Sequence, residues 1–545
     1  MLPSPSAKIP VPRGYTTEQI PRDDPYSYTS GRWLNRDELE RKSRYIHFDF
    51  QALCERAIEL CPGATRIVEH EKKEGGFNKV FIFIMDTGSQ AVARLPTGIA
   101  GPARLTTNSE FATITYLQSK LALPIPKILD WKDTSSKPIG TEYIIQEHVK
   151  GVQLHYKWLE MNPEQHMLCT SALSLMIKKM ASLDFPAYGS LYFSDAPIEA
   201  SKKIPFDQGH GQGFCIGPHC GPIYWNQCPG NPSYMAAPVP IVALVSLTDL
   251  NFRDDLTSYS AGLIETGTSR LPKQEDTVSS KRPYQGSIEE HIHLLKSSQE
   301  VMEKLITDKR IQNAASPVLI HADFHMKNIY VSAEDPTIIT GIIDWQSTSI
   351  EPAFLYQRQS PEFAALPAPS QTEILGQETE DTSQTESDRK DVSICNQTYD
   401  VVMSALIPRC AHRDSPDPAL FSIIHYCHTT WTDSAVMLRQ ELIGLSARWK
   451  ELQLDGLCPY SPTEEELQKQ KQDSEDFEVE QRLMFWLMAN MDTNSDGWVP
   501  NEDWESALEA NRAAYHLWIE AARESEGEGE LGVEKADILW PFDAR

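Results

Sequence analysis

The sequence feature that most constrains this chain is a short polar loop set between two strongly apolar runs. The loop, residues 321–328, reads His-Ala-Asp-Phe-His-Met-Lys-Asn, with apolar residues on both sides. A second apolar run, Thr337–Ile343, ends at Asp344, sixteen residues after Asn328. Short apolar runs that end in turn residues are typical of buried strands. The pattern therefore predicts neighbouring strands whose ends bring Asp323, Asn328 and Asp344 together.

These three side chains have the chemistry that phosphoryl transfer requires. Transfer to a hydroxyl needs a carboxylate that accepts the hydroxyl proton and oxygen ligands that hold Mg²⁺ on the phosphates. We interpret Asp323 as the base, and Asn328 and Asp344 as the metal ligands. The structural alternative is that Asp323 and Asn328 cap a turn and Asp344 begins a loop. That alternative suits each residue alone, but it explains the three together, in this order, less well.

The pattern also resembles a known family. His321-x-Asp323-x-His325-x-x-Asn328, followed by Ile343-Asp344-Trp345, resembles the catalytic loop and metal-binding segment of the aminoglycoside phosphotransferase family. The resemblance implies an α+β, protein-kinase-like bilobal fold with a β-rich small lobe and a large helical lobe. It also implies the use of ATP with Mg²⁺. The two histidines could bind a metal, but in this context we expect them to brace the loop by hydrogen bonds.

A second resemblance extends over most of the chain and is weakest in 205–300 and in an acidic insertion. It is to the fungal "altered inheritance of mitochondria" phosphotransferase-like proteins, and it implies a mitochondrial location. The visible N-terminus carries no transit signal, so a cytoplasmic location is the alternative. The stretches that carry this resemblance are Tyr28–Trp33, Glu74–Phe81, Ala93–Pro96, Ile343–Gln346, His425–His428 with Trp431, and Asp496–Pro500.

A small β-rich unit precedes the loop. Val80–Ala93 contains two β-rich runs around a short turn, which predicts a hairpin. Gly75, Gly76 and Asn78 come just before it, where backbone amides could approach phosphates. A plain turn is an equally good interpretation of the two glycines.

The resemblance assigns further nucleotide-site residues. Arg94 stands where a kinase would place a phosphate-contacting lysine, and its fork can pair with phosphate or carboxylate oxygens. Relatives that resemble hydroxyacyl-CoA kinases also carry arginine there, so arginine alone does not imply an inactive protein. Glu110 resembles the helix glutamate that pairs with this base, although Thr107 and Glu110 also form a capping-box pattern. Glu147 and Val149 would lie in the hinge, where backbone groups read adenine.

The chain divides into five predicted parts. We expect helices near 46–60, 107–121, 168–183, 291–305, 421–452 and 477–487, and an irregular excursion at 205–240. The polar, acidic insertion buries too little apolar surface to offset its ordering entropy, so we expect it to be exposed and disordered. The parts are an N-terminal extension (1–40), the small lobe (41–148), the large lobe with the catalytic loop (149–365), the insertion (366–397) and a C-terminal helical part of the large lobe (398–545).

Composition excludes some classes of partner. The chain has 545 residues, of which 50 are basic and 77 acidic, and its formal charge is −27. Such a charge repels nucleic-acid backbones and anionic lipid surfaces. Its ten cysteines are scattered, which favours free thiols in a reducing compartment. No run reaches the roughly eighteen apolar residues of a membrane span, and no signal-peptide core is visible.

Two further groups imitate metal sites. The first group consists of three cysteines and one histidine. It lacks the paired C-x-x-C spacing of zinc sites, so we do not favour zinc there. The second, residues 492–503, imitates the first half of a calcium-binding loop, but proline holds its ninth position and aspartate its twelfth. We expect a glycine-containing turn there. The residues concerned are Cys215, His219, Cys220 and Cys228 in the first group, and Asp492, Asn494, Asp496, Gly497, Pro500 and Asp503 in the second.

The sequence thus predicts an ATP- and Mg-dependent phosphotransferase that acts on a hydroxyl of a small molecule. One alternative is a catalytically weak or inactive nucleotide-binding scaffold, which the arginine at 94 and the thin glycine turn would suit. A protein kinase is a weaker alternative, because Trp345-Gln346 replaces Phe-Gly and no Ala-Pro-Glu segment follows. The acceptor and the oligomeric state stay open, because acceptor pockets are built from variable helices and loops.

Overall fold

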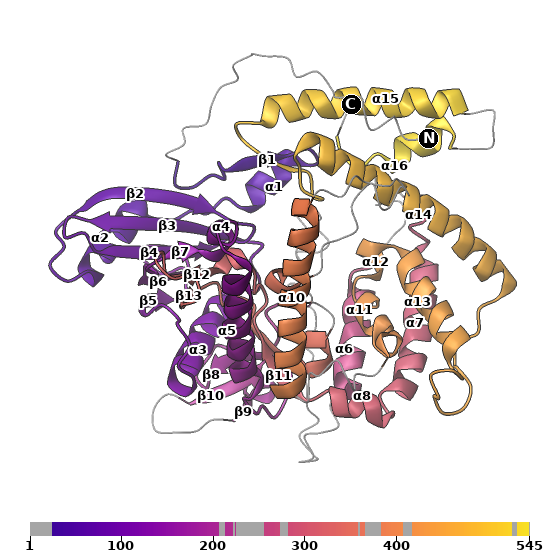
Figure 1. Ribbon diagram of the computed structural model, residues 1–545, viewed down its shortest axis with the longest axis horizontal. Helices are drawn as coiled ribbons and strands as arrows, with labels where there is room; N and C mark the ends of the chain where they lie inside the picture. The colour runs from indigo at the N-terminus through magenta and orange to yellow at the C-terminus, as the bar shows by residue number, and fades with distance from the viewer. Residues whose placement is uncertain are drawn as a thin grey trace.

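The fold is α+β and has two lobes, as the sequence predicts (Figure 1). Strands of the first 150 residues gather on one side, and helices of the second half gather on the other. No helix of the described residues combines the length and apolar character that crossing a bilayer requires. The computed structural model describes residues 24–206, 213–221, 224, 256–272, 282–357, 360–365, 383–406, 417–525 and 531–543.

The small lobe is built on one antiparallel sheet of five strands in the order β2-β3-β4-β6-β5. Alternate residues of β3 are buried, and Phe81 and Phe83 pack with Leu53 and Ala57 of helix α2 (Phe50–Leu60). The predicted hairpin is therefore present. The strands are β2 (Ile67–Glu74), β3 (Asn78–Met85), β4 (Gln90–Pro96), β5 (Ile128–Lys132) and β6 (Tyr143–Glu147).

Helix α3 (Leu105–Lys120) lies between the sheet and the large lobe. Its Phe111 contacts Trp131 of β5 on one side, with ring centroids 4.4 Å apart, and Phe193 of β8 (Ser190–Phe193) on the other, at 5.4 Å. Aromatic pairs at these distances contribute beyond the area they bury. The packing fixes α3 against both lobes and therefore fixes the residues of its first two turns.

The large lobe holds the predicted polar loop between short strands. Strand β11 (Pro317–Ile320) pairs with β14 (Ser349–Pro352), and β12 (Ile329–Val331) lies between β13 (Ile339–Ile342) and β7 (Val152–Gln153). The loop therefore leaves one sheet at Ile320 and enters the next at Ile329. Both of its ends are anchored in buried strands.

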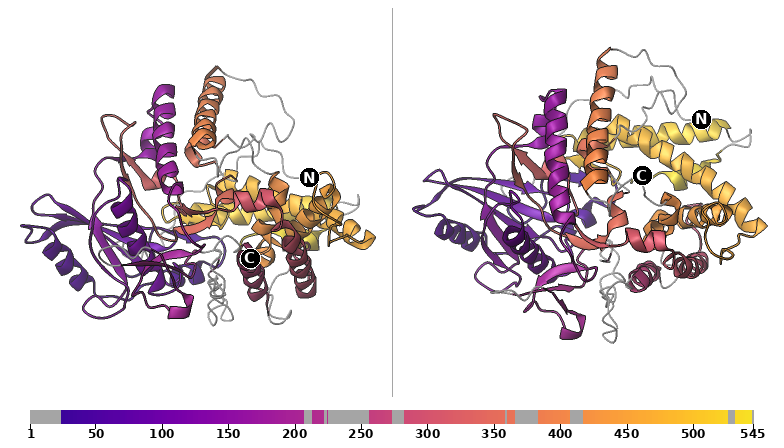
Figure 2. Two further views of the ribbon diagram at one scale, coloured as in Figure 1. Left: turned by 90° about the horizontal axis from the view of Figure 1, so that it is seen from below. Right: turned by 60° about the horizontal axis from the view of Figure 1, so that its bottom comes forward.

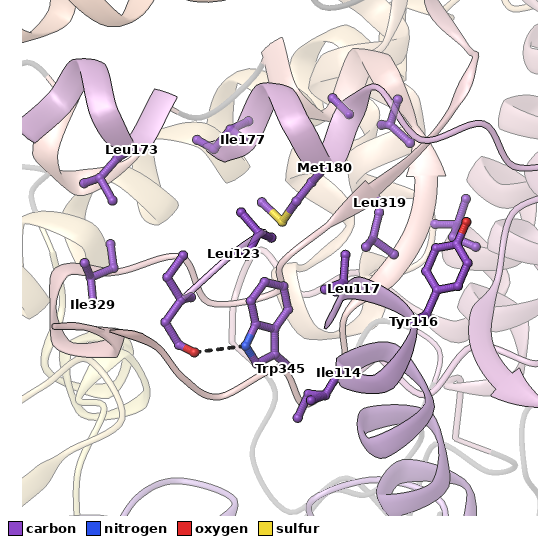
Figure 3. Close-up of a cluster of buried hydrophobic side chains, with 14 of the residues drawn as sticks. Ile114, Tyr116, Leu117, Leu123, Leu173, Ile177, Met180, Leu319, Ile329 and Trp345 are labelled. Atoms are coloured by element: carbon purple, nitrogen blue, oxygen red, sulfur yellow. Dashed lines mark hydrogen bonds between the residues drawn. The ribbon is translucent and has the colours of Figure 1, made fainter. Parts of the chain in front are cut away.

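Trp345 anchors the next segment in the main core (Figure 3). Its side chain is 1% exposed, and its Nε1 donates to the Ile342 carbonyl at 3.1 Å. Leu173, Ile177 and Met180 of helix α5 (Pro163–Ala181) belong to the same cluster. Because the ring is buried beside α5, the residue before it, Asp344, is held at the edge of the core.

A second core joins the helices of the large lobe. Ser287 caps α7 by accepting a hydrogen bond from the Glu290 amide, the capping arrangement that serines favour. The helices are α6 (Leu256–Ser269), α7 (Ile288–Leu305), α8 (Lys309–Ala314), α11 (Ser422–Tyr426), α12 (Thr430–Asp433) and α13 (Ala435–Arg448).

The end of the chain forms what we call the C-terminal helical unit. It consists of α14 (Glu464–Met491), β15 (Trp498–Pro500), α15 (Trp504–Ser525) and α16 (Val533–Leu539). The two long helices run along one edge of the molecule (Figures 1 and 2). Strand β15 pairs antiparallel with β1 (Gly31–Trp33), so this unit incorporates the start of the described chain.

Two predictions about loops need correction. The insertion predicted to be disordered over 366–397 is helical from Ser383, because α10 (Ser383–Leu406) packs beside α5 (Figure 2). Cys395, Tyr399 and Met403, four residues apart, form its buried stripe. Residues 366–382 lie outside the described residues. The excursion predicted at 205–240 includes β10 (Phe214–Gly217), which pairs with β8 and with β9 (Ile204–Pro205), while most of the rest is not described.

Candidate active site

The polar loop brings Asp323 and Asn328 into direct contact. The Asn328 Nδ2 donates to the Asp323 carbonyl at 3.0 Å and to its Oδ2 at 2.7 Å. Residues Met326–Asn328 form a 3-10 turn, which returns the chain toward Asp323 before β12 begins. The Asp323 side chain stays 54% exposed. The loop therefore presents a carboxylate that is oriented from within and open to solvent.

His321 braces this loop by hydrogen bonds, as predicted, and His325 lies beside two of its neighbouring carboxylates. The buried His321 ring donates from Nε2 to the Ile343 carbonyl at 3.1 Å, and its Nδ1 accepts from the Asp323 amide at 3.1 Å. Burial lowers the pKa of His321, which favours the neutral ring that this pair of bonds requires. The exposed His325 ring lies 3.3 Å from Asp323 Oδ1 through Nε2 and 3.5 Å from Glu362 Oε2 through Nδ1.

Asp344 lies beside the loop with an unusual backbone. Its φ is 63°, in the left-handed region that aspartate tolerates better than most residues. The Ile343 amide donates to the Asn328 carbonyl at 3.0 Å, so the two segments are bonded directly. The turn points the Asp344 carboxylate toward the small lobe, where its Oδ1 accepts from Arg94 Nη2 at 2.7 Å.

Arg94 joins three parts of the fold. Its Nη1 donates to Glu110 Oε1 on α3, while its Nη2 reaches Asp344 in the large lobe. Both Arg94 and Glu110 are buried. Burial disfavours the charge on Arg94, but Glu110 and Asp344 outweigh it and raise the pKa. Burial raises the pKa of Glu110, and the charge of Arg94 opposes that rise. The predicted contact between strand and helix is thus present, with a second carboxylate that the sequence did not predict.

The capping-box alternative for Glu110 is wrong. Helix α3 begins two residues before Thr107, and its N-cap Arg104 makes no side-chain cap bond. The Thr107 hydroxyl instead donates to Glu142 Oε2 at 2.8 Å. Because Thr107 lies inside the helix, Glu110 is one turn deeper than a capping residue, and its carboxylate points at Arg94.

Gln346 is a site residue that the sequence interpretation missed. Its Oε1 accepts from Asn78 Nδ2 at 2.5 Å and from Arg94 Nη2 at 3.3 Å, and its Nε2 donates to the Ala100 carbonyl at 3.0 Å. It therefore bonds the start of β3, the strand β4 and the segment after β4 to the loop after Asp344. Its position two residues after Asp344 was the available signal.

The glycine turn between β2 and β3 is open. The Gly75 amide donates to the Asn78 carbonyl at 3.0 Å, which closes the turn. Neither Gly75 nor Gly76 has a positive φ, and a Cβ added at either position would meet no atom within 4 Å. Backbone conformation and packing therefore do not require glycine at these positions. These two observations therefore leave both interpretations of the glycines, phosphate approach and plain turn, as predictions.

The hinge residues lie where β6 leaves the sheet. The Glu147 amide donates to the Lys127 carbonyl at 2.9 Å, which holds the last residue of β6 against the segment before β5. Val149 is buried two residues later, where it lies directly against Gly341 of β13. The segment thus joins the small-lobe sheet to the large-lobe strands, the position that the hinge prediction requires.

The oxygen atoms left open at the site fit a magnesium ion. The Asn328 Nδ2 is used within the loop, but no donor of the described residues reaches its Oδ1. The Asp344 Oδ1 is held by Arg94, and likewise no described residue donates to Oδ2. Amide and carboxylate oxygens are the ligands that Mg²⁺ prefers in proteins.

The two imitations of metal sites are occupied by other contacts. The Cys220 Sγ lies 2.7 Å from the Tyr192 hydroxyl, and Cys215 faces the Phe193 carbonyl. Across the described ranges no three His, Cys, Asp or Glu side chains gather as a metal would require, and Cys228 lies outside them. In the 492–503 loop, both carboxylate oxygens of Asp496 accept hydrogen bonds, from the Trp33 ring and the Trp498 amide, each at 3.1 Å.

Comparisons with known proteins agree with the motifs. Residues 264–354 match the model of the phosphotransferase enzyme family (APH). A subtelomeric hrmA-associated cluster protein of Aspergillus fumigatus is 26% identical over 517 residues, which cover 89% of this chain and 97% of the relative. The mitochondrial "altered inheritance of mitochondria protein 9" of Lachancea thermotolerans is 23% identical over 575 residues, covering 90% and 89%. The resemblance to the phosphotransferase family and to these fungal proteins is confirmed.

Among solved structures, a Ralstonia eutropha protein described as an aminoglycoside phosphotransferase is similar to this chain at 13% identity. The match has a TM-score of 0.39 and covers 85% of this chain and 99% of the other.

Proposed function

We propose, from the confirmed resemblance to the phosphotransferase enzyme family, that this protein transfers the γ-phosphoryl group of ATP to a hydroxyl of a small molecule. The observation that carries the proposal is the cluster of Asp323, Asn328 and Asp344. They lie on two loops bonded to each other, and Arg94 ties the second loop to the small lobe.

Asp323 is the proposed general base. Its carboxylate is more than half exposed and is oriented by the Asn328 amide, so an acceptor hydroxyl can reach Oδ1, which lies 3.3 Å from the exposed His325 ring. The hydroxyl oxygen forms a bond to the γ-phosphorus while the bond to the β,γ-bridging oxygen breaks. The hydroxyl proton passes to Asp323, and ADP leaves with the bridging oxygen.

The nucleotide is proposed to lie between the glycine turn and the hinge. The backbone of the turn at Gly75 and Gly76 approaches its phosphates, with the Gly76 amide as the donor, because the Gly75 amide is bonded to the Asn78 carbonyl. Backbone groups of Glu147 and Val149 hold the adenine. Arg94 contributes a fixed positive charge beside the phosphates, which Glu110 holds in place. Asn78 supports the end of the turn through its bond to Gln346.

Asn328 Oδ1 and Asp344 Oδ2 are the proposed ligands of Mg²⁺. When bound, the ion would neutralise phosphate charge and orient the γ-phosphoryl group. The chain's own contribution is to aim the two oxygens, Asn328 through its bond to Asp323 and Asp344 through its left-handed backbone and Arg94.

A nucleotide-binding scaffold without turnover is the second candidate, and one contact favours it. Arg94 reaches past Glu110 to Asp344, so it already holds one oxygen of a proposed metal ligand. An arginine that keeps this bond with nucleotide present would weaken the metal site while leaving the nucleotide contacts intact. Turnover measured on a broad panel of hydroxyl compounds separates the two candidates.

The primary test is binding of Mg-ATP followed by thermal denaturation. At about one hundred times its dissociation constant, a ligand stabilises the fold by about 2.7 kcal/mol. We expect Mg-ATP to raise the melting temperature of wild type, Asp344→Ala to remove most of that rise, and Asp335→Ala to keep it. Asp335 is a matched control, because it is an exposed aspartate in the turn between β12 and β13. Folded wild type that shows no rise at millimolar Mg-ATP contradicts both candidates.

Asp323→Asn tests the base. The variant keeps the size of the side chain, so we expect unchanged Mg-ATP binding and turnover reduced about 10²-fold or more. Turnover equal to wild type would assign the base elsewhere. Binding of Mg-ATP by wild type without turnover on any hydroxyl compound would favour the scaffold.

We also propose a mitochondrial location, because the Lachancea thermotolerans and Yarrowia lipolytica relatives carry that location in their names. Fractionation of cells that express the tagged full chain tests it, and recovery in the cytosolic fraction would contradict it.

A further inference from the structure

Residues 24–34, which we call the strap, lie between the glycine turn and the C-terminal helical unit. On the small-lobe side the strap contacts Glu74, the residue directly before Gly75. The Glu74 Oε2 accepts from the Thr29 amide at 2.7 Å, from the Thr29 hydroxyl at 3.2 Å and from the Ser30 hydroxyl at 3.1 Å. The Glu74 side chain is 1% exposed. The end of β2, which leads into the turn, is thus bonded to the strap by a buried carboxylate.

The start of β3, which follows the turn, is bonded to the strap as well. Lys79, just after the turn, donates to the carbonyls of Tyr26 and Ser27, each at 2.8 Å, and to Glu74 Oε1 at 2.9 Å. Its side chain is also 1% exposed. Buried charges of this kind are stable only when every donor and acceptor is satisfied, so the strap completes the pairing of Glu74 with Lys79 across the turn.

Arg44 reaches the turn itself. Its Nε donates to the Gly76 carbonyl at 3.2 Å, while its Nη1 donates to the Glu40 carbonyl at 2.8 Å and to Glu40 Oε2 at 2.6 Å. The guanidinium lies over the Trp33 ring, 4.3 Å from its centroid. Arg44 is buried. A fixed guanidinium therefore joins the tip of the turn to the strap and to helix α1 (Asp37–Ser43).

The other side of the strap is bonded to the C-terminal helical unit. The register of β1 against β15 places Arg32 opposite Val499, and Trp33 Nε1 donates to Asp496 Oδ2 at 3.1 Å. The Asn501 side chain donates to the Thr29 carbonyl at 2.9 Å. A Cβ at Gly31 would lie 2.5 Å from the Trp498 ring, so the strands approach as closely as glycine permits.

We propose that the strap and the C-terminal helical unit position the glycine turn, with Arg44 as the positioning residue that holds its tip. The proposal rests on the proposed function, because it assumes that the turn binds phosphates. The turn has open space above Gly75 and Gly76, so no neighbouring side chain packs on that face of the backbone. Besides the bond from the Gly75 amide to Asn78 and the bond from Asn78 to Gln346, the turn is held by the contacts of Glu74, Lys79 and Arg44 with the strap and helix α1.

The chain offers a matched control in Arg32. It lies on the strap, with its guanidinium 4.1 Å from the Trp504 ring centroid, and it pairs with Asp37 at 2.7 Å. It thus resembles Arg44 in its stacking on tryptophan and in its ion pair, but it donates to no residue of the turn among the contacts of the described chain. The experiment compares Arg44→Ala, Arg44→Lys and Arg32→Ala in the full-length protein.

Two measurements are made on each variant. Amide hydrogen exchange of the peptide that spans 72–80 reports the turn without any ligand, and calorimetry gives the dissociation constant of Mg-ATP. We expect both Arg44 variants to speed exchange at the Gly75 amide and to raise the dissociation constant about tenfold, the scale of one charge-assisted hydrogen bond. Arg32→Ala removes one contact between the strap and the C-terminal helical unit but none with the turn, so it is expected to change both quantities less than either Arg44 variant does. Arg44→Lys keeps the charge and the stem, so it serves even where Arg44→Ala does not fold.

A third variant tests the connection to the C-terminal helical unit. Trp33→Phe keeps an aromatic ring under Arg44 but removes the bond to Asp496. We expect it to speed exchange at the Gly75 amide in the same direction as Arg44→Lys and by a smaller factor.

The outcomes separate this proposal from the proposed function. Unchanged exchange at the turn in both Arg44 variants overturns the positioning role. Faster exchange with an unchanged dissociation constant overturns the link between turn and phosphates. Wild type that binds no Mg-ATP contradicts the proposed function instead, and the exchange comparison still decides whether the strap fixes the turn.

Discussion

Arg94 shows what a guanidinium provides that an ammonium cannot. Its two terminal nitrogens bond carboxylates from two different parts of the fold, Glu110 through Nη1 and Asp344 through Nη2. The sixteen-residue spacing from strand to helix made the first contact predictable from sequence. The second contact depends on how the lobes meet, 250 positions apart, and no local pattern reports that.

Arg94→Lys keeps the positive charge, but it should be more disruptive than a change that keeps the charge would suggest. A single ammonium satisfies one carboxylate well and leaves the other poorly paired. We expect the free energy of unfolding to fall by about 1–3 kcal/mol and the dissociation constant of Mg-ATP to rise about tenfold. Chemical denaturation and calorimetry measure the two effects. The exposed Arg66→Lys is the control and should change neither; a variant at 94 that matches it would show that the fork is not used.

Gly76→Ala separates a structural glycine from a functional one. The position has an ordinary φ and free space for a Cβ, so alanine should leave stability unchanged or raise it by about 0.4–1 kcal/mol. A methyl group there would meet the proposed phosphates, and we expect weaker Mg-ATP binding. Gly444 in α13 also has free space for a Cβ. Gly444→Ala should change stability as Gly76→Ala does and should leave Mg-ATP binding unchanged. Unchanged binding by Gly76→Ala would favour the plain turn.

Among elements, the sequence was most informative where the apolar period was clear. Buried residues alternate along β3 and recur at helical spacing in α5 and α7, and β4 is a short continuous buried run, so the existence of these elements was predictable. Helix α10 was missed, because its apolar residues are few and its stability comes from α5. Its Asp391 pairs with His166 of α5, and its Asn396 donates to the Ala364 carbonyl at 2.9 Å. Tertiary packing, which local composition does not encode, decided that segment.

Helix α7 carries a buried histidine whose charge state should make stability depend on pH. The His291 Nε2 bonds the Gln285 carbonyl at 2.8 Å, and its Nδ1 bonds the Thr430 hydroxyl at 2.9 Å. Burial lowers the pKa of His291 from 6.5 to about 4, so the folded protein keeps the ring neutral. In the unfolded chain the His291 ring is protonated below pH 6.5, whereas in the folded chain it is protonated only below about pH 4.

The stability contributed by neutral His291 is thus complete above pH 6.5 and is lost as the pH falls toward 4. The full difference is about 3 kcal/mol. Urea denaturation between pH 4.5 and 7 measures it. The His291→Gln variant, less stable overall, should show a smaller decline with falling pH than wild type does, and equal slopes would contradict the assignment.

For the whole molecule, the C-terminal helical unit is attached to both lobes. The strap joins it to the small lobe, and the buried Arg439 of α13 joins it to the large lobe. Arg439 donates from Nε to Gln470 Oε1 at 2.7 Å and from Nη2 to Asp473, both on α14, and from Nη1 to Glu290 on α7. The sequence predicted helices here and assigned them to the large lobe; their contacts with the start of the chain were outside the reach of any local pattern.

Arg439→Ala should be among the most damaging changes far from the site. It removes the buried cation of this network and leaves Asp473 and Glu290 with Lys469 alone, whose Nζ lies 2.6 Å and 3.5 Å from them. Removing one partner of a buried ion network costs about 3–5 kcal/mol. Arg448 is the last residue of α13, and Arg448→Ala breaks its partly exposed ion pair with Asp417. This change should lower the free energy of unfolding by about 1 kcal/mol or less. Chemical denaturation compares the two, and equal losses would show that the Arg439 network is not uniquely important.

The pairing of β1 with β15 also sets an order of events during synthesis. Trp33 and Asp496 are bonded in the fold but are 463 positions apart in the chain. At roughly 5–20 residues per second, a ribosome needs roughly 20 to 90 s to reach the second after the first. For most of that interval, once synthesis has passed Glu147, the small-lobe sheet is complete while the buried charges beneath its glycine turn lack the strand that covers the strap. A nascent chain arrested before β15 should therefore hold a small lobe whose turn is still open to protease, and only about the last tenth of translation would close it.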